Sequence, residues 1–225
     1  MRVVEKKEAR GSLRWIRIAA NDAATVFNRH IYEASNIPFD DEIIWVSPLK
    51  NDEYAEYRDQ DFLDLIDLEL PKLPLNTFWP KLGPQWDGLG RTENGRILLV
   101  EAKANIPEVV SPGTGASSES RALIDRSVGE TKAFLGVDKD IPWTGKLYQY
   151  ANRLAHLYLL RELNDIDAYL VFVYFVGDDE VNGPKSIAEW KSALSVVKKV
   201  LGLGSRHALS KYVVDVYIDI AEIEK

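Results

Sequence analysis

The 225-residue sequence contains no cysteine, one methionine and three histidines. Without cysteine the chain forms no disulfide, carries no thiol nucleophile and offers no thiolate metal ligand. This composition is compatible with a reducing compartment, so we expect a cytoplasmic protein. The sequence also has no Gly-x-Ser-x-Gly motif and no pair of histidines at zinc-binding spacing. Hydrolases that depend on those motifs therefore rank last among the candidate functions.

Long apolar runs, internal repeats and low-complexity tracts are also missing. No segment approaches the roughly 20 apolar residues that a membrane helix needs, and the polar stretch Met1–Lys7 does not resemble a signal peptide. We therefore expect no membrane association. The segment 111–118 is rich in Gly, Ser and Pro but lacks the spacing of a phosphate-binding loop. It is expected to be a mobile surface loop, with a lid over a cleft as the alternative.

The charge balance is acidic. The sequence has 35 acidic and 28 basic residues, which gives a formal net charge of −7. Broad non-specific binding to nucleic acid depends on neutralising phosphates, and this balance counts against it. A local basic cleft is still compatible with the composition.

The most informative stretch is Gln85–Lys103, which predicts a β-hairpin. Asn94-Gly95 between extended segments is the strongest short-range signal for such a turn. The second arm begins with the aliphatic run Ile97–Val100. A run that is apolar on both faces of a strand is typical of a central strand covered on both sides.

The register of this hairpin decides which side chains share a face. A two-residue turn at Asn94-Gly95 would place Asp87 opposite Ala102 and facing away from Glu101 and Lys103. A three-residue loop, with glycine in the left-handed position of a bulge, would place Asp87 opposite Glu101, with Lys103 on the same face. We favour the second register because glycine suits that position. A bulge at another glycine of the first arm would have the same effect: Gly88 or Gly90.

Two carboxylates at this distance repel each other unless a cation lies between them. Asp87 and Glu101 are oxygen ligands of the kind that Mg²⁺ prefers, and Mn²⁺ is the alternative metal. The carbonyl of Ala102 is a natural third ligand. The ammonium of Lys103 would then orient or deprotonate a water molecule, or stabilise the charge of a pentavalent phosphate. The competing interpretation is a solvated sheet edge, where a Glu-x-Lys pair contributes little.

This arrangement resembles the PD-(D/E)xK superfamily, the restriction-endonuclease-like nucleases. Asp87 matches the first acid, Glu101 the second acid and Lys103 the lysine of the Glu-x-Lys motif. Trp86 departs from the pattern, because proline often precedes the first acid. The resemblance implies an αβββαβ core over about residues 12–176 and Mg²⁺-dependent hydrolysis of phosphodiesters. Members of the superfamily are often dimers.

The segment 143–163 predicts an amphipathic helix with Gln149 and Arg153 on its polar side. Some nuclease families of the superfamily carry a glutamine at the site, with a tyrosine or basic residue four positions later. The resemblance therefore implies that Gln149 belongs to the catalytic centre and that Arg153 contacts substrate. Trp86 would flank the entrance and stack on a base, with burial in the core as the alternative. An ordinary solvated helix face is the alternative for the helix, above all for His156.

The remaining periodicities predict one α/β domain, 1–225, with a mixed central sheet flanked by helices. Ser12 is a plausible N-cap for the first helix, and residues 51–70 are expected to form a helix with an acidic outer face, placed away from the cleft or used to bind a partner. The predicted helices are 12–34, 51–70, 119–135, 143–163 and 186–201, and the other predicted strands are 42–46, 167–176 and 211–220, the last at a sheet edge.

The sequence thus favours a metal-dependent nuclease that hydrolyses phosphodiester bonds, with DNA ranked ahead of RNA as substrate. The alternative is a non-catalytic module on the same fold that binds nucleic acid or protein, which the acidic charge supports. A homodimer or a protein partner is compatible with both.

Overall fold

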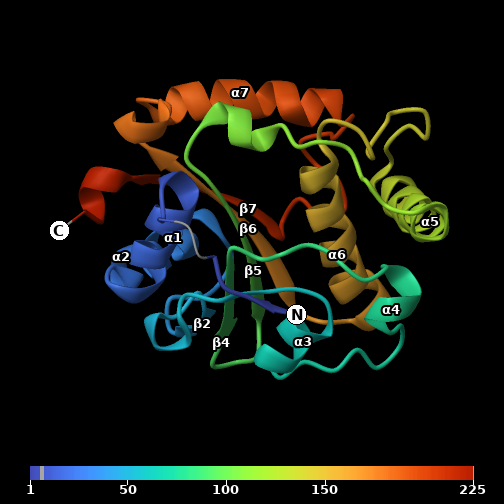
Figure 1. The fold of residues 1–225 in the computed structure, drawn as a ribbon, viewed down its shortest axis with the longest axis horizontal. Helices are drawn as coiled ribbons and strands as arrows, with labels where there is room; N and C mark the ends of the chain where they lie inside the picture. Colours follow the sequence, from blue (N-terminus) through green and yellow to red (C-terminus); the bar gives the residue numbers. More distant parts are fainter. Residues whose placement is uncertain (6–7, 225) are drawn as a thin grey trace.

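A five-stranded mixed sheet organises the chain in the computed structural model, which describes residues 1–5 and 8–224 (Figure 1). The strand order is β2-β4-β5-β6-β7, with antiparallel pairing from β2 to β5 and parallel pairing from β5 to β7. A separate two-stranded ribbon pairs β1 with β3. The strands are β1 (Arg2–Val3), β2 (Ile43–Ser47), β3 (Glu56–Tyr57), β4 (Gly88–Thr92), β5 (Ile97–Lys103), β6 (Ala168–Val176) and β7 (Val213–Asp219).

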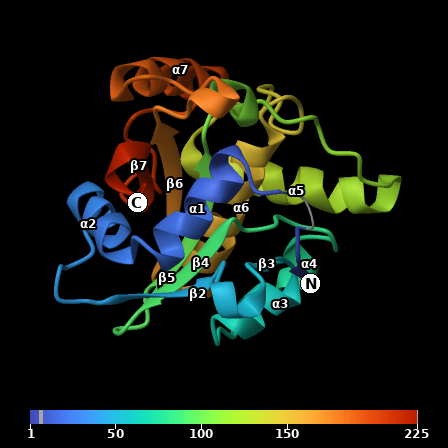
Figure 2. The same ribbon diagram turned by 60° about the vertical axis from the view of Figure 1, so that its left-hand side comes forward.

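Helices cover both faces of the sheet. Figures 1 and 2 show α1 and α2 on one side, and α6 with its neighbour α5 on the other. Two clusters of buried apolar side chains separate these layers from the sheet, and α7 packs into the cluster that contains α6. The helices are α1 (Gly11–Asn21), α2 (Ala24–Ala34), α3 (Gln60–Leu65), α4 (Leu75–Phe78), α5 (Ser118–Leu135), α6 (Tyr148–Asn164) and α7 (Ile187–Val200).

The predicted mixed α/β architecture is confirmed at this level. Every residue of β6 is buried, as its uninterrupted apolar run predicted, because helices cover it from both sides. Strand β7 lies at the sheet edge, and its residues alternate between buried and partly exposed. Within residues 1–5 and 8–224, no helix is both long enough and apolar enough to cross a membrane.

The prediction of one continuous helix over 12–34 is wrong. The segment is divided into α1 and α2 at Asp22 and Ala23. The side-chain amide of Asn21 donates hydrogen bonds to the carbonyls of Arg17 at 2.8 Å and Pro48 at 2.7 Å, which fixes the chain at this break. Ser12 is not the N-cap, because the helix begins at the preceding glycine.

The predicted acidic helix over 51–70 is also wrong. Within this segment the α-helical part is α3. Glu56 and Tyr57 are extended and pair with the N-terminal strand β1. Four residues in this stretch have positive φ angles of 54–55°, which no α-helix accommodates: Glu53, Tyr54, Asp59 and Asp67. Tertiary pairing overrides the local helical periodicity here, with a consequence for the site described next.

Candidate active site

The β4–β5 hairpin adopts the register with a three-residue loop. The Gly95 N–H donates to the carbonyl of Thr92 at 3.0 Å, and the Thr92 N–H donates to the carbonyl of Arg96 at 2.8 Å. Gly95 has a φ of 82°, the left-handed conformation expected of it. The ladder runs from Arg91, paired with Ile97, to Gly88, paired with Val100, so the favoured three-residue loop is confirmed. Asp87 directly precedes the ladder, and the same register continued by one residue would set it opposite Glu101.

Asp87 closes the end of the ladder. Its N–H donates to the Val100 carbonyl at 3.2 Å, and its Oδ2 accepts the Ala102 N–H at 2.7 Å. The N–H and C=O of one strand residue point to the same side. The Ala102 carbonyl therefore points toward the side on which Asp87 lies, where the sequence placed a third metal ligand.

Glu101 is more deeply buried than Asp87 and has two cationic partners. It is 1% exposed, and its Oε2 accepts a hydrogen bond from Arg153 Nε at 2.6 Å and forms an ion pair with Nη2 at 2.5 Å. Lys103 Nζ forms an ion pair with the other carboxylate oxygen. Arg153, 3% exposed, also donates to the carbonyl of Gln85 at 2.7 Å. The predicted polar side of this helix is therefore buried against the site and is not a solvated face.

Glu56 is a third acid that sequence reasoning missed. Tyr57 pairs antiparallel with Trp86, which places Glu56 beside Asp87 at the same end of the sheet. Glu56 is 5% exposed, and its Oε2 accepts a hydrogen bond from the Gln85 side-chain amide at 2.5 Å. No local sequence pattern predicts this contact, because it depends on the pairing of two segments that are about thirty residues apart in the chain.

The acids of this cluster differ in their titration. Burial raises the pKa of Asp87 well above its usual value, and the charges of Glu101 and Glu56 raise it further. Burial also raises the pKa of Glu56, although the Gln85 amide and Arg17 oppose this shift. Both groups resist ionisation unless a cation compensates them.

Glu101 and Lys103 form the ionised pair. Burial acts to raise the pKa of Glu101, but Arg153 and Lys103 more than offset it and the pKa is lowered. Burial acts to lower the pKa of Lys103, but Glu101 and Asp87 overcome it and the pKa is raised. Lys103 is therefore cationic at neutral pH, and Glu101 is anionic.

The cluster contains three carboxyl groups and two cationic side chains. A proton or an additional cation can balance the third carboxyl. Carboxylate and carbonyl oxygens suit Mg²⁺ in their chemistry, so Asp87, Glu56 and the Ala102 carbonyl fit such an ion in kind. Among the described residues no group of three or more His, Asp or Glu side chains is arranged to hold a metal ion. To become a further metal ligand, Glu101 would have to break its ion pair with Arg153 and turn toward the metal.

A cleft of about 870 Å³ opens onto this cluster. Glu56, Asp87, Gln149 and Arg153 line it, together with the loop residues 110–117. Ser111 Oγ accepts the Gln149 N–H at 2.9 Å, which ties that loop to the start of α6. The glycine-rich loop thus covers part of the cleft in the described structure.

The cleft reaches Asp87 but does not reach the whole predicted site. Glu101 and Lys103 instead line a separate hollow of only about 10 Å³, whose walls include Gln149 and Val109. Gln149 therefore separates the open cleft from the buried ion pair. A ligand in the cleft would meet Asp87 and Gln149 first.

Trp86 is placed in the core and not at the site entrance. It is fully buried, so its predicted stacking on a base is wrong, and the alternative of core packing holds. The Arg153 guanidinium lies over its ring, 4.8 Å from the centroid. Trp86 thus positions the arginine that binds Glu101. Trp79 is also buried, although it lines the cleft.

Comparison with known proteins identifies no relative. No protein-family model, no curated protein and no solved structure matches this chain.

Proposed function

We propose that this protein is a metal-dependent nuclease with a restriction-endonuclease-like αβββαβ core. One observation carries the proposal: Asp87, directly before β4, lies close enough to Glu101 and Lys103 of β5 to interact with their charges, and an open cleft reaches Asp87. The order of elements α1, α2, β2, β4, β5, α6 and β6 fits that core. DNA remains ranked ahead of RNA as the substrate.

Asp87 and Glu56, with the carbonyl of Ala102, would hold Mg²⁺ or Mn²⁺ at the end of β4. Such an ion supplies a polarised phosphate oxygen and an activated water molecule. The raised pKa values of Asp87 and Glu56 support this assignment. Two neighbouring carboxyl groups with raised pKa values ionise readily only when a cation binds beside them.

Lys103 is the group proposed to act on the reacting phosphate. Its raised pKa keeps it protonated at neutral pH, so it would donate hydrogen bonds and stabilise developing negative charge, and it would not serve as a base. Gln149 lies between the cleft and Lys103 and would orient water there. Arg153 would hold Glu101 in place, or contact phosphate once Glu101 turns to the metal.

Cleavage of labelled single- and double-stranded DNA and RNA, with Mg²⁺ and with Mn²⁺, tests this proposal. We expect metal-dependent cutting that Lys103→Met and Asp87→Asn each reduce by at least a hundredfold. Asp67→Asn, an exposed acid outside the cleft, is the matched control and should cut like the parent. Cutting that survives in both variants would remove these residues from the chemistry.

A second candidate is a non-catalytic binding module on the same fold. The observation that favours it is the paired state of Glu101, which Arg153 and Lys103 neutralise beside a hollow of only about 10 Å³. In this case the cluster is structural and the cleft binds a partner. Absence of cutting on all four substrates, together with absence of Mn²⁺ binding, would favour this function over the nuclease.

A further inference from the structure

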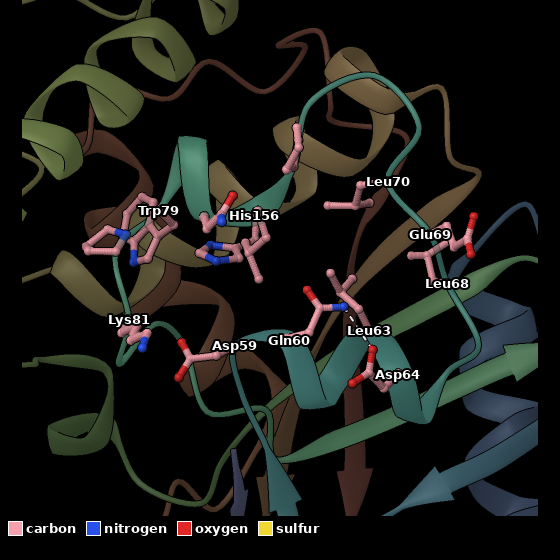
Figure 3. A pocket seen from close by; sticks show the side chains of 14 residues that line it. Asp59, Gln60, Leu63, Asp64, Leu68, Glu69, Leu70, Trp79, Lys81 and His156 are labelled. Atoms are coloured by element: carbon pink, nitrogen blue, oxygen red, sulfur yellow. Dashed lines mark hydrogen bonds between the residues drawn. The ribbon is translucent and has the colours of Figure 1, made fainter.

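A second hollow, of about 680 Å³, lies outside the candidate active site. It is formed between α3, α4 and the segments that follow each of them, and one residue of α6, His156, reaches it (Figure 3). It meets the nuclease cleft only at Trp79, Pro80 and Lys81, which line both. Its volume is that of a pocket for a small organic molecule.

His156 gives this pocket a defined hydrogen-bond acceptor. Its Nδ1 lies 2.9 Å from the carbonyl oxygen of Asn152. Because a carbonyl only accepts, Nδ1 carries the hydrogen, and Nε2 of the neutral ring is left with a lone pair. Burial lowers the pKa of His156 to about 3, so the ring is neutral at physiological pH. Within residues 1–5 and 8–224, Nε2 has no hydrogen-bond partner.

The walls around this acceptor are apolar and aromatic. Trp79 packs edge-on against His156, with ring centroids 4.8 Å apart, and Figure 3 shows the two rings side by side. Leu63 and Leu75 are buried side chains of the same lining. A flat apolar group with a single N–H or O–H donor would fill this region and satisfy Nε2.

The rim of the pocket is acidic. Both carboxylate oxygens of Asp59 accept backbone N–H groups, from Leu82 at 3.2 Å and Gly83 at 2.9 Å. Asp64 accepts the Gln60 amide at 2.8 Å. Glu69 forms no ion pair within the part of the chain that the structure describes, and it lies at the end of the pocket away from Lys81 (Figure 3). The acidic rim as a whole therefore favours a cationic group.

We infer that this pocket binds a small organic cation that combines an aromatic ring, one ring N–H or O–H donor and an ammonium group. The ring lies against Trp79, its donor meets His156 Nε2, and the ammonium faces the acidic rim that Asp59, Asp64 and Glu69 form. This site is independent of the proposed nuclease centre, and its ligand does not enter the hydrolytic reaction.

Tryptamine is the probe for this inference, because it carries an indole N–H and an ammonium group. The ring nitrogens of the three histidines are followed by ¹H–¹⁵N correlation NMR during titration, with His156→Phe used to assign the His156 signals. We expect a saturable shift of His156 Nε2. The benzothiophene analogue of tryptamine, which lacks the donor, should bind roughly tenfold more weakly. Indole-3-propionate, which reverses the charge, should not bind.

The rim is tested with variants that are exposed and leave the core unchanged. Glu69→Gln should weaken tryptamine binding by about two- to fivefold. Asp67→Asn, an exposed acid of the same segment that does not line the pocket, should leave it unchanged. Three outcomes would overturn the inference: no saturable shift at millimolar tryptamine, equal binding of the benzothiophene analogue, or equal weakening by both acid variants.

Discussion

At the scale of single residues, the candidate site depends on how Asp87 is compensated. It lies between two other acids at the end of a strand, and its pKa is raised by burial and by their charges. A carboxyl with a raised pKa in the folded state binds its proton more tightly there than in the unfolded chain. Its contribution to stability is therefore lost as the pH rises from about its ordinary value of 3.8 toward the raised one.

Asp87→Asn should therefore stabilise the metal-free protein at neutral pH. Asparagine removes the charge but still offers an oxygen to the Ala102 N–H. We expect a gain of about 1 kcal/mol at pH 7, or a rise of roughly 2–4 °C in melting temperature. Melting curves of parent and variant from pH 4 to pH 8 check this. The gain should shrink toward pH 4, and a gain that does not change with pH would contradict the assignment.

Arg153 should be coupled energetically to Glu101. Arg153→Met leaves a buried carboxylate with Lys103 as its remaining cationic partner, at a cost of about 3 kcal/mol. The double variant Arg153→Met/Glu101→Gln should recover a large part of that loss. Urea unfolding of the four proteins gives the coupling free energy. Strictly additive losses would mean that the pair does not interact as described.

Some residues of the candidate site could be predicted from the sequence, and others could not. Asp87, Glu101 and Lys103 lie on one hairpin, so turn chemistry alone could bring them together. Glu56 joins them through pairing between distant segments, which no local pattern encodes. The burial of Arg153 and His156 was also missed, because helical periodicity shows that a face is polar but does not show what packs against it.

At the scale of elements, the hairpin turn controls the site. Because side chains alternate across a strand, a shift of one residue in the register would turn Asp87 away from Glu101. Gly95 sets that register, with its φ of 82° and no neighbouring atom within 4 Å of the position that a Cβ would occupy. The turn was predictable because its own Asn-Gly pair favours it, although the Asp41 carboxylate also accepts the Asn94 N–H. The segment 51–70 was not, because its strand β3 forms by pairing with β1 and with Trp86, which are distant in the sequence.

Gly95→Ala should cost about 1–2 kcal/mol from backbone strain alone, since the added methyl group meets no neighbour. Gly95→Asn should cost less, because asparagine adopts the left-handed conformation more readily. Chemical denaturation of both variants measures the difference. Equal costs would show that the left-handed conformation of residue 95 is not what the turn requires.

At the scale of the whole molecule, the sheet carries the site at one end and leaves a separate pocket beneath α4. The order and type of the long elements followed from apolar periodicity, because β5 and β6 are buried in the pattern that their sequences show. The placement of the short elements between β2 and β4 did not, since they follow tertiary contacts. That region supplies both Glu56 and most of the second pocket.

The proposed function requires that the acid cluster holds a divalent cation. Calorimetric titration of Mn²⁺ into the protein at pH 7 tests it, with Asp87→Asn and the matched control Asp67→Asn beside the parent. We predict one bound ion for the parent and the control, with protons released because Asp87 and Glu56 ionise on binding. The Asp87 variant should bind at least tenfold more weakly. Equal affinity in all three proteins, or no binding to the parent, would contradict the account.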